Sequence, residues 1–128
     1  MDADRLRVRS GSPFEEAIGF SRAVRTGERI VVSGTAPIWP DGSCPEDAGA
    51  QARRCFEIAL TAVEQLGGSA AGVVRTRMFI TDASVAMEVG AAHRKAVGAA
   101  APASTMVVVA ALLDPRWKVE IELEAVAG

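Results

Sequence analysis

Residues 106–111 read Met-Val-Val-Val-Ala-Ala, and this continuous apolar run decides the fold. A strand with one face in water alternates apolar and polar residues, whereas this run is apolar throughout. We therefore predict a strand whose two faces are both buried. The wider segment from Ala96 to Leu113 is uncharged over 18 residues, but Gly98 and Pro102 interrupt it, so we predict no membrane span.

Other segments alternate and predict strands with one buried face. Residues 73–81 and residues 119–124 place apolar side chains at every second position, with three glutamates between them in the second segment. Residues 5–9 alternate apolar residues with arginine and predict an edge strand. Residues 20–25 and 29–33 predict a hairpin around a Thr-Gly-Glu turn.

Two helices complete the pattern. From about Asp47 to Leu66, apolar residues recur at three-four spacing, and Gly67-Gly68 follows as a stop signal. Ser84 is expected to cap a second helix that runs to about Val97.

The predicted order is β-β-β-α-β-α-β-β in one domain covering residues 1–128. Two helices can cover only one face of so wide a sheet. The other face is left open, and we expect residues 106–111 in its middle. An exposed apolar patch of that kind indicates an interface between subunits. A mean hydropathy of +0.20 points the same way.

Composition narrows the class of protein. The chain is 49% hydrophobic and 23% charged, which is typical of an ordered globular domain. Its net charge of −2 gives no basic footprint for nucleic acid. Four phenylalanines and two tryptophans, without tyrosine, offer little for base stacking. We therefore do not expect a nucleic-acid partner.

Cysteine and histidine usage argues against a metal site. Cys44 and Cys55 form no C-x-x-C motif, and His93 is the sole histidine. We expect neither a metal nor a cofactor, and two unpaired thiols kept reduced. The first residues, Met-Asp-Ala-Asp-Arg, lack the apolar stretch of a secretory signal, so we expect a cytoplasmic protein.

Six segments are similar, in order and spacing, to the motifs of one family. Residues 18–24 (Ile-Gly-Phe-Ser-Arg-Ala-Val) are similar to I-G-P-Y-S-Q-A-V with one proline fewer. The other five are residues 30–37 (a strand ending in S-G-x-x-P), Ala50-Gln51-Ala52 (A-Q-A), residues 73–82 (V-V-K-x-x-x-F/Y-x-x-D), Pro102-Ala103-Ser104-Thr105 (P-A-R-S) and Val119-Glu120-Ile121-Glu122 (V-E-I-E). From about residue 15 to its end, the chain resembles the Rid superfamily (YjgF-like, reactive-intermediate deaminase).

The resemblance implies an α+β fold like that of the bacillus-type chorismate mutase, with a six-stranded mixed sheet backed by two helices. It also implies a homotrimer that binds a small-molecule ligand in clefts between subunits. The best-known activity of the family is hydrolysis of enamines and imines, formed by PLP enzymes, to 2-oxo acids and ammonia. Older family names suggest an endoribonuclease, which the acidic composition argues against.

The family resemblance places a catalytic carboxylate at Glu120, which would position or activate water. Glu122 is the alternative if the register slips by two, because both side chains point to the same face of a strand. The competing interpretation is a solvated polar face. The family's carboxylate-binding arginine, in P-A-R-S, is replaced by Ser104, and a hydroxyl supplies neither the charge nor the two-pronged grip. Its helix asparagine and following cysteine correspond to Gly90 and Met106.

The expected substrate-binding residues are Ser104, Phe20, Ser33, Gly34 and Arg22. Phe20 stands where the family has tyrosine and can pack but not donate a hydrogen bond. Ser33 and Gly34 end a strand where a ligand could meet backbone N–H groups. Arg22, or else Arg116, is a candidate for the missing cation, although surface arginines of this kind are common.

Two functions follow from these residues. One is a hydrolase or deaminase that acts on a small imine, enamine or related C–N substrate. The other is a non-catalytic trimer that binds a small metabolite.

Overall fold

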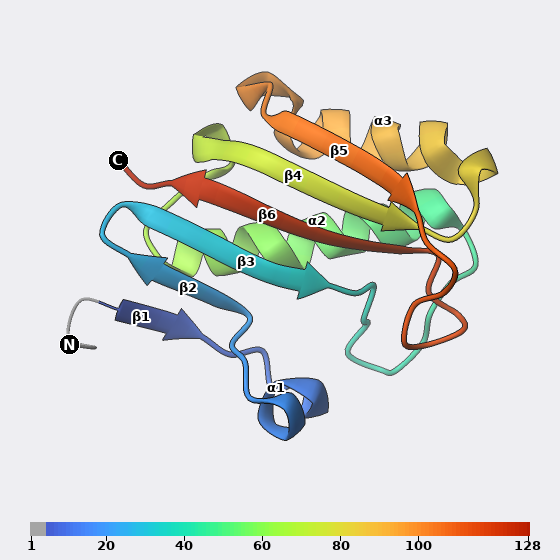
Figure 1. Ribbon diagram of the computed structural model, residues 1–128, viewed down its shortest axis with the longest axis horizontal. Coiled ribbons are helices and arrows are strands. Elements are labelled where there is room, and N and C mark those ends of the chain that lie inside the picture. Colours follow the sequence, from blue (N-terminus) through green and yellow to red (C-terminus); the bar gives the residue numbers. More distant parts are fainter. Residues whose placement is uncertain (1–4) are drawn as a thin grey trace.

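A computed structural model describes residues 5–128 and shows one six-stranded sheet with helices on one face (Figure 1). The strand order is β1-β2-β3-β6-β4-β5, with β4 and β5 parallel and all other neighbours antiparallel. The strands are β1 (Arg5–Val8), β2 (Ala23–Thr26), β3 (Arg29–Thr35), β4 (Val73–Ile80), β5 (Ala103–Val108) and β6 (Val119–Val126). The predicted α+β fold with a mixed sheet is confirmed.

Helices α2 (Ala48–Gln65) and α3 (Ala86–Val97) bury the apolar face of the sheet (Figure 1). Phe56 and Val63 of α2 are buried with Ile121 and Leu123 of β6 in one core cluster. This burial follows from the periods of the sequence, since apolar residues recur every three or four positions in α2 and every second position in β6.

The ends of α2 are those that the sequence predicts. Asp47 is the N-cap, and its carboxylate accepts a hydrogen bond from the Gly49 amide at 3.1 Å. Gly67 follows the helix with φ of 87°, a left-handed conformation that favours glycine. The Gly68 amide donates to the Val63 carbonyl at 2.9 Å, which closes the helix end.

A short helix near the N-terminus was not predicted. Helix α1 (Pro13–Ile18) occupies part of the expected loop, and β2 starts at Ala23 rather than residue 20. Ser12 caps α1 by accepting from the Phe14 amide, and Pro13 stands in the first turn, where its missing N–H has no consequence. The prediction drawn from the first residues concerns residues 1–4, which lie outside the described part of the chain.

The predicted cap of the second helix was also wrong. Asp82, not Ser84, is the capping residue, and its carboxylate accepts from the Ser84 amide at 2.8 Å. This cap begins a single 3-10 turn (Ala83–Val85), and α3 starts after it. Aspartate caps as well as serine does, so the sequence left the choice between two neighbouring positions open.

Residues 106–108 of the apolar run end an edge strand and residues 109–111 lie outside any strand, so the run is not in the middle of the open face. Strand β5 covers Ala103–Val108 and pairs only with β4, so its outer edge is unpaired. Met106 packs against the core, but Val107 and Val108 are 42% and 56% exposed. Within the single chain, burial of both faces is therefore not seen. The predicted place of the run was wrong because β5 is the last strand of the sheet, and burial by a second chain stays a prediction.

The open face of the sheet mixes charge pairs with scattered apolar residues. Arg29 of β3 pairs with Glu124 at 2.9 Å, and Arg77 of β4 pairs with Glu122 at 3.6 Å. Val31 is the apolar residue among them, at 37% exposure. Within residues 5–128, no helix combines the length and the apolar character that crossing a membrane requires. Two further 3-10 turns, Ala70–Gly72 and Gly98–Ala100, join the elements.

Candidate functional site

A β-bulge in β3 creates a space for Glu120. Val32 pairs with Leu123 and Thr35 pairs with Ile121, so Ser33 and Gly34 together face a single residue of β6. The Glu120 carboxylate lies against Gly34, because a methyl group there would come within 3.2 Å of Glu120 Cδ and Oε2. Any residue larger than glycine at position 34 would therefore press on the carboxylate.

Arg22 lies on the other side of Gly34. Its Nη2 donates to the Gly34 carbonyl, and its Nη1 lies 4.0 Å from Glu15 Oε2. The guanidinium carbon lies 5.7 Å from the centre of the Phe20 ring, within the range of a cation–π contact. Arg22 is 5% exposed. A buried cation, an aromatic ring and a half-buried carboxylate therefore meet around one backbone position.

Burial governs the ionisation of this cluster. Desolvation raises the pKa of the Glu120 carboxyl, with the Arg22 charge opposing the rise and the Glu122 charge adding to it. Desolvation lowers the pKa of Arg22, and the charges of Glu15 and Glu120 oppose that shift. Among residues 5–128, no side chain or backbone group donates a hydrogen bond to the Glu120 carboxylate. Its oxygens are therefore available to a water or a ligand.

Glu122 has a different environment from Glu120. It lies opposite Arg77 in the sheet and forms an ion pair with it. Glu122 is thus the residue opposite the bulge, but the carboxylate that lies against Gly34 is that of Glu120.

Ser33 is tied into the backbone at the bulge. Its hydroxyl donates to the Ser21 carbonyl at 2.7 Å, and its amide donates to the Arg22 carbonyl at 2.9 Å. Both donors of Ser33 are thus used within the chain. Ser33 holds the segment that carries Phe20 and Arg22 beside Gly34, whether or not it also contacts a ligand.

Ser104 is not brought together with Glu120. It pairs with Thr76 across β4 and β5, and the Thr76 hydroxyl lies 2.8 Å from the Ser104 hydroxyl. Thr76 is fully buried on the helix side and lies 2.7 Å from Nε2 of His93 in α3. Glu120 pairs with Phe79, and side chains alternate along a strand, so Ser104 and Glu120 lie on opposite faces of the sheet.

The partner of His93 could not be read from the sequence. The pKa of His93 is lowered by burial, which favours a neutral ring that hydrogen-bonds Thr76. The ring also packs edge-on against Phe56 at 5.6 Å. A threonine whose side chain points to the buried face of a strand is a weak indication of a polar partner on the helix that covers this face.

Arg116, the other candidate cation, is fixed within its own loop. Its Nε and Nη2 bind the two carboxylate oxygens of Asp114 at 3.1 and 2.9 Å, and Nη1 donates to the Gly42 carbonyl. The hydrogen bonds from Arg116 lower the pKa of Asp114. The sequence left Arg22 and Arg116 as alternatives, and Arg22 is the one whose charge acts on Glu120.

The two cysteines are not activated as nucleophiles. Cys55 is buried and its pKa is strongly raised by desolvation, and desolvation also raises the pKa of Cys44. A raised pKa keeps both thiols protonated and weakly nucleophilic. Over residues 5–128, no three His, Cys, Asp or Glu side chains form a group that could hold a metal ion.

Sequence reasoning missed Glu15 altogether. This residue of α1 is 3% exposed, and its carboxylate accepts from the Ser10 amide at 3.0 Å and from the Ser10 hydroxyl. It is the nearest carboxylate to the Arg22 guanidinium. The run Ser12-Pro13 followed by two glutamates is typical of a helix start and could have revealed α1.

Comparison with known proteins assigns this chain to a family. A sequence model described as "Endoribonuclease L-PSP" matches residues 12–127. The chain belongs to this family. It is 37% identical over 123 residues to an uncharacterized protein of Streptomyces coelicolor, SCO2049, covering 95% of this chain and 92% of the relative.

Solved structures of this family, also called YjgF or Rid, have the same fold. Rv2704 from Mycobacterium tuberculosis, described as a member of the YjgF/YER057c/UK114 family, is 43% identical with a TM-score of 0.88, covering 96% of this chain and 99% of that one. YyfA of Yersinia pestis, a protein of unknown function from the Rid family, is 27% identical with a TM-score of 0.81, covering 94% of each chain. The resemblance drawn from six sequence motifs is thus confirmed.

Proposed function

We propose that this Rid-family protein hydrolyses a small imine or enamine at a site built around Glu120. The observation that carries the proposal is the environment of that carboxylate. It is half-buried, its pKa is raised by burial, and no hydrogen bond from residues 5–128 occupies its oxygens. A carboxylate with a raised pKa accepts a proton from water more readily than an ordinary glutamate does.

In the proposed reaction, Glu120 orients a water molecule toward the imine carbon. The water oxygen bonds to that carbon, the imine nitrogen takes up a proton from solvent, and Glu120 accepts a proton from the attacking water, which gives a carbinolamine. Glu120 then returns its proton to the nitrogen, the C–N bond breaks, and the hydroxyl releases its proton to solvent, which leaves a carbonyl compound and ammonia. General acid–base help of this kind contributes a rate factor of about 10² to 10⁴.

Arg22 supplies the positive charge in this proposal. Its charge acts on Glu120, and one of its five N–H donors is used in a hydrogen bond to the protein, namely to Gly34. Phe20 packs beside the guanidinium and gives the site an apolar wall. The charge of Arg22 would attract a substrate carboxylate. It would thus replace the arginine of P-A-R-S, whose position is occupied here by Ser104.

We further propose that the site is completed by assembly into a homotrimer, with the ligand bound between subunits. The exposed edge of β5, with Val107 and Val108, supports this proposal, because a long exposed apolar edge strand is a liability in an isolated chain. Sedimentation equilibrium tests it, and a single-chain mass at micromolar concentration would contradict it.

The activity is tested by generating imines from several amino acids with an amino-acid oxidase and following semicarbazone trapping. The protein should lower the trapped fraction and speed the appearance of the 2-oxo acid. Glu120→Gln should abolish this effect while Glu122→Gln keeps most of it, since Glu122 is ion-paired to Arg77. Semicarbazone formation at the same rate as in buffer for every amino acid would exclude the activity, and full activity in Glu120→Gln would exclude the site.

A second candidate function is ligand binding without turnover. The observation that favours it is Ser104, whose hydroxyl is bonded to Thr76 on the face opposite Glu120. A thermal-shift screen with small carboxylates separates the two, because a pure binding protein is stabilised by ligand but leaves imine lifetimes unchanged. An endoribonuclease is the less favoured alternative, since the net charge of −2 gives no basic footprint for RNA.

A further inference from the structure

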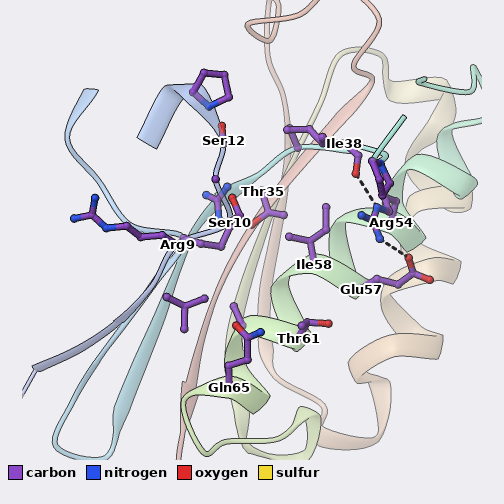
Figure 2. A pocket seen from close by; sticks show the side chains of 17 residues that line it. Arg9, Ser10, Ser12, Thr35, Ile38, Arg54, Glu57, Ile58, Thr61 and Gln65 are labelled. Atoms are coloured by element: carbon purple, nitrogen blue, oxygen red, sulfur yellow. Dashed lines mark hydrogen bonds and ion pairs between the residues drawn. The ribbon is translucent and has the colours of Figure 1, made fainter. Parts of the chain in front are cut away.

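A cavity lies on the helix side of the sheet, away from the open face that carries Glu120. It has a volume of about 630 Å³, within the range of small-molecule sites. Figure 2 shows Ile58, Thr61 and Gln65 of α2 along one wall, with Arg9, Ser10 and Ser12 of the N-terminal segment along the other. We call this cavity the α1–α2 groove.

Arg22 lines the groove and has unmet hydrogen-bonding capacity. It is 5% exposed, and its Nε is buried without a partner among residues 5–128. The neighbouring Glu15 does not fill this role, because its oxygens accept from Ser10 and lie no closer than 4.0 Å to Arg22 Nη1. Buried donors are nearly always paired, so this guanidinium calls for an acceptor oxygen.

Arg54 supplies a second cation on the opposite wall. Its Nε donates to the Ile38 carbonyl at 2.7 Å and its Nη1 donates to Glu57 at 3.2 Å (Figure 2). These bonds fix the plane of the guanidinium and leave three of its five N–H donors unused. Its side chain is 25% exposed, so the charge is partly sheltered from water.

The charges around the groove select a single negative charge. Three arginines, Arg9, Arg22 and Arg54, stand against Glu15 and Glu57, which leaves one net positive charge. In Figure 2, Arg9 extends away from the cavity, so the net positive charge that faces a ligand is at most one. A phosphate or nucleotide with two or more negative charges is therefore poorly matched, whereas a carboxylate matches the planar arginine fork.

The rest of the lining is largely apolar. Val8, Ile38, Ile58 and Ala62 contribute hydrocarbon, and Thr35 and Thr61 contribute hydroxyls. A ligand that fills such a cavity needs an apolar body as well as its charged end.

We propose that the α1–α2 groove binds a small monocarboxylate with an aliphatic or aromatic body, held by Arg54 and Arg22. This site shares Arg22 with the Glu120 site, but Arg54 and the α2 wall belong to the groove and not to the surroundings of Glu120. It has no counterpart in the motifs by which the chain resembles its family, apart from Arg22 itself.

Benzoate is the probe, with benzamide as the neutral molecule of the same shape. In an NMR titration of the whole protein, benzoate should produce saturable shifts at the amides of Ser10, Ile58 and Thr61. Benzamide should bind at least about tenfold more weakly, since it lacks the charge-assisted bonds. Equal binding of the two probes, or no saturable binding of benzoate, would overturn the proposal.

Two matched variants in one ion pair give opposite outcomes. Arg54→Gln should weaken benzoate binding by about tenfold, while Glu57→Gln, which frees Arg54, should tighten it by about twofold or more. Thr61→Trp should block the groove, and because Thr61 is exposed on α2, the fold should tolerate it. Unchanged affinity in both Arg54→Gln and Thr61→Trp would place the ligand elsewhere.

Glu120→Gln separates this proposal from the proposed function. Benzoate should bind this variant at least as tightly as it binds the native protein, whatever happens to imine hydrolysis, because Arg22 then faces one negative charge fewer. Loss of benzoate binding in Glu120→Gln, with shifts at Phe20 and Ser33, would assign the ligand to the open face and contradict the groove.

Discussion

The Glu120 carboxylate packs against Gly34 so closely that a single methyl group on Gly34 would lie 3.2 Å from its Cδ and Oε2. The bulge in β3 and the Arg22 bond to the Gly34 carbonyl both fix this arrangement. The carboxylate is thus held between backbone and solvent, and the first three predictions below concern its surroundings.

Gly34→Ala should displace the Glu120 carboxylate and abolish any imine hydrolysis while costing about 1 kcal/mol of unfolding free energy. The end of the glutamate side chain can move by a few tenths of an ångström, which limits the cost. Gly90→Ala is the matched control, because a methyl group there meets no atom within 4 Å and lies inside a helix. The control should gain about 0.5 to 1 kcal/mol in urea unfolding and keep its activity. Equal behaviour of the two variants would count against the packing described above.

Glu120→Gln should become more stable relative to the native protein as the pH rises. Because burial raises the pKa of Glu120, the folded state holds this proton more tightly than the unfolded chain does. The native protein therefore loses stability as the pH rises from the ordinary glutamic-acid pKa to the raised value, and glutamine does not titrate. Urea midpoints should be measured between about pH 4 and about pH 7. The midpoint of Glu120→Gln minus that of the native protein should rise with pH. A difference that stays constant or falls with pH contradicts the raised pKa.

Arg22→Met should be strongly destabilising, by about 3 kcal/mol, because it leaves the buried Glu15 carboxylate without its cation. Adding Glu15→Gln should recover a large part of this loss, since the double variant buries no unpaired charge. Denaturant unfolding of the four proteins in the cycle gives the coupling. Additive effects of the two changes would show that the pair at 4.0 Å does not interact.

Thr76→Val should cost about 1 to 2 kcal/mol, because it removes the hydroxyl that links His93 and Ser104 in a buried position. Thr76→Ser keeps the hydroxyl and should lose less. Ser104→Ala should have a smaller effect than Thr76→Val, as Ser104 is exposed on the edge strand. A larger loss for Ser104→Ala would mean that the network depends on the edge rather than on the core.

Much of the fold could be predicted because the spacing of apolar residues agrees with the residues that begin and end each element. Apolar spacing in α2, the Asp47 cap and Gly67 gave this helix within a residue at each end. Residues 106–111 were misplaced for a physical reason. An apolar run indicates that a strand is buried, but it does not show whether its own chain or another chain buries it. Here the chain leaves β5 at the edge.

The site was harder to predict than the fold. Glu120, Gly34, Arg22 and Phe20 were all candidates, and they lie together, but only the bulge at Ser33–Gly34 sets their geometry. No local sequence pattern indicates this bulge. Ser104 was grouped with them because of its position in the family motif. However, it pairs with Thr76, so its hydroxyl points to the helix side of the sheet. Glu15 was missed because its six-residue helix is too short to show a period.

The most direct test is to titrate the carboxyl carbon of Glu120 itself, by ¹³C NMR of the native protein against Glu120→Gln to assign the resonance. The account predicts one midpoint above the ordinary value for a glutamic acid, and a further rise when Arg22 is neutralised in Arg22→Met/Glu15→Gln, because Arg22 opposes the shift. A midpoint at or below the ordinary value would mean that Glu120 is a solvated surface carboxylate and not the base of a hydrolytic site.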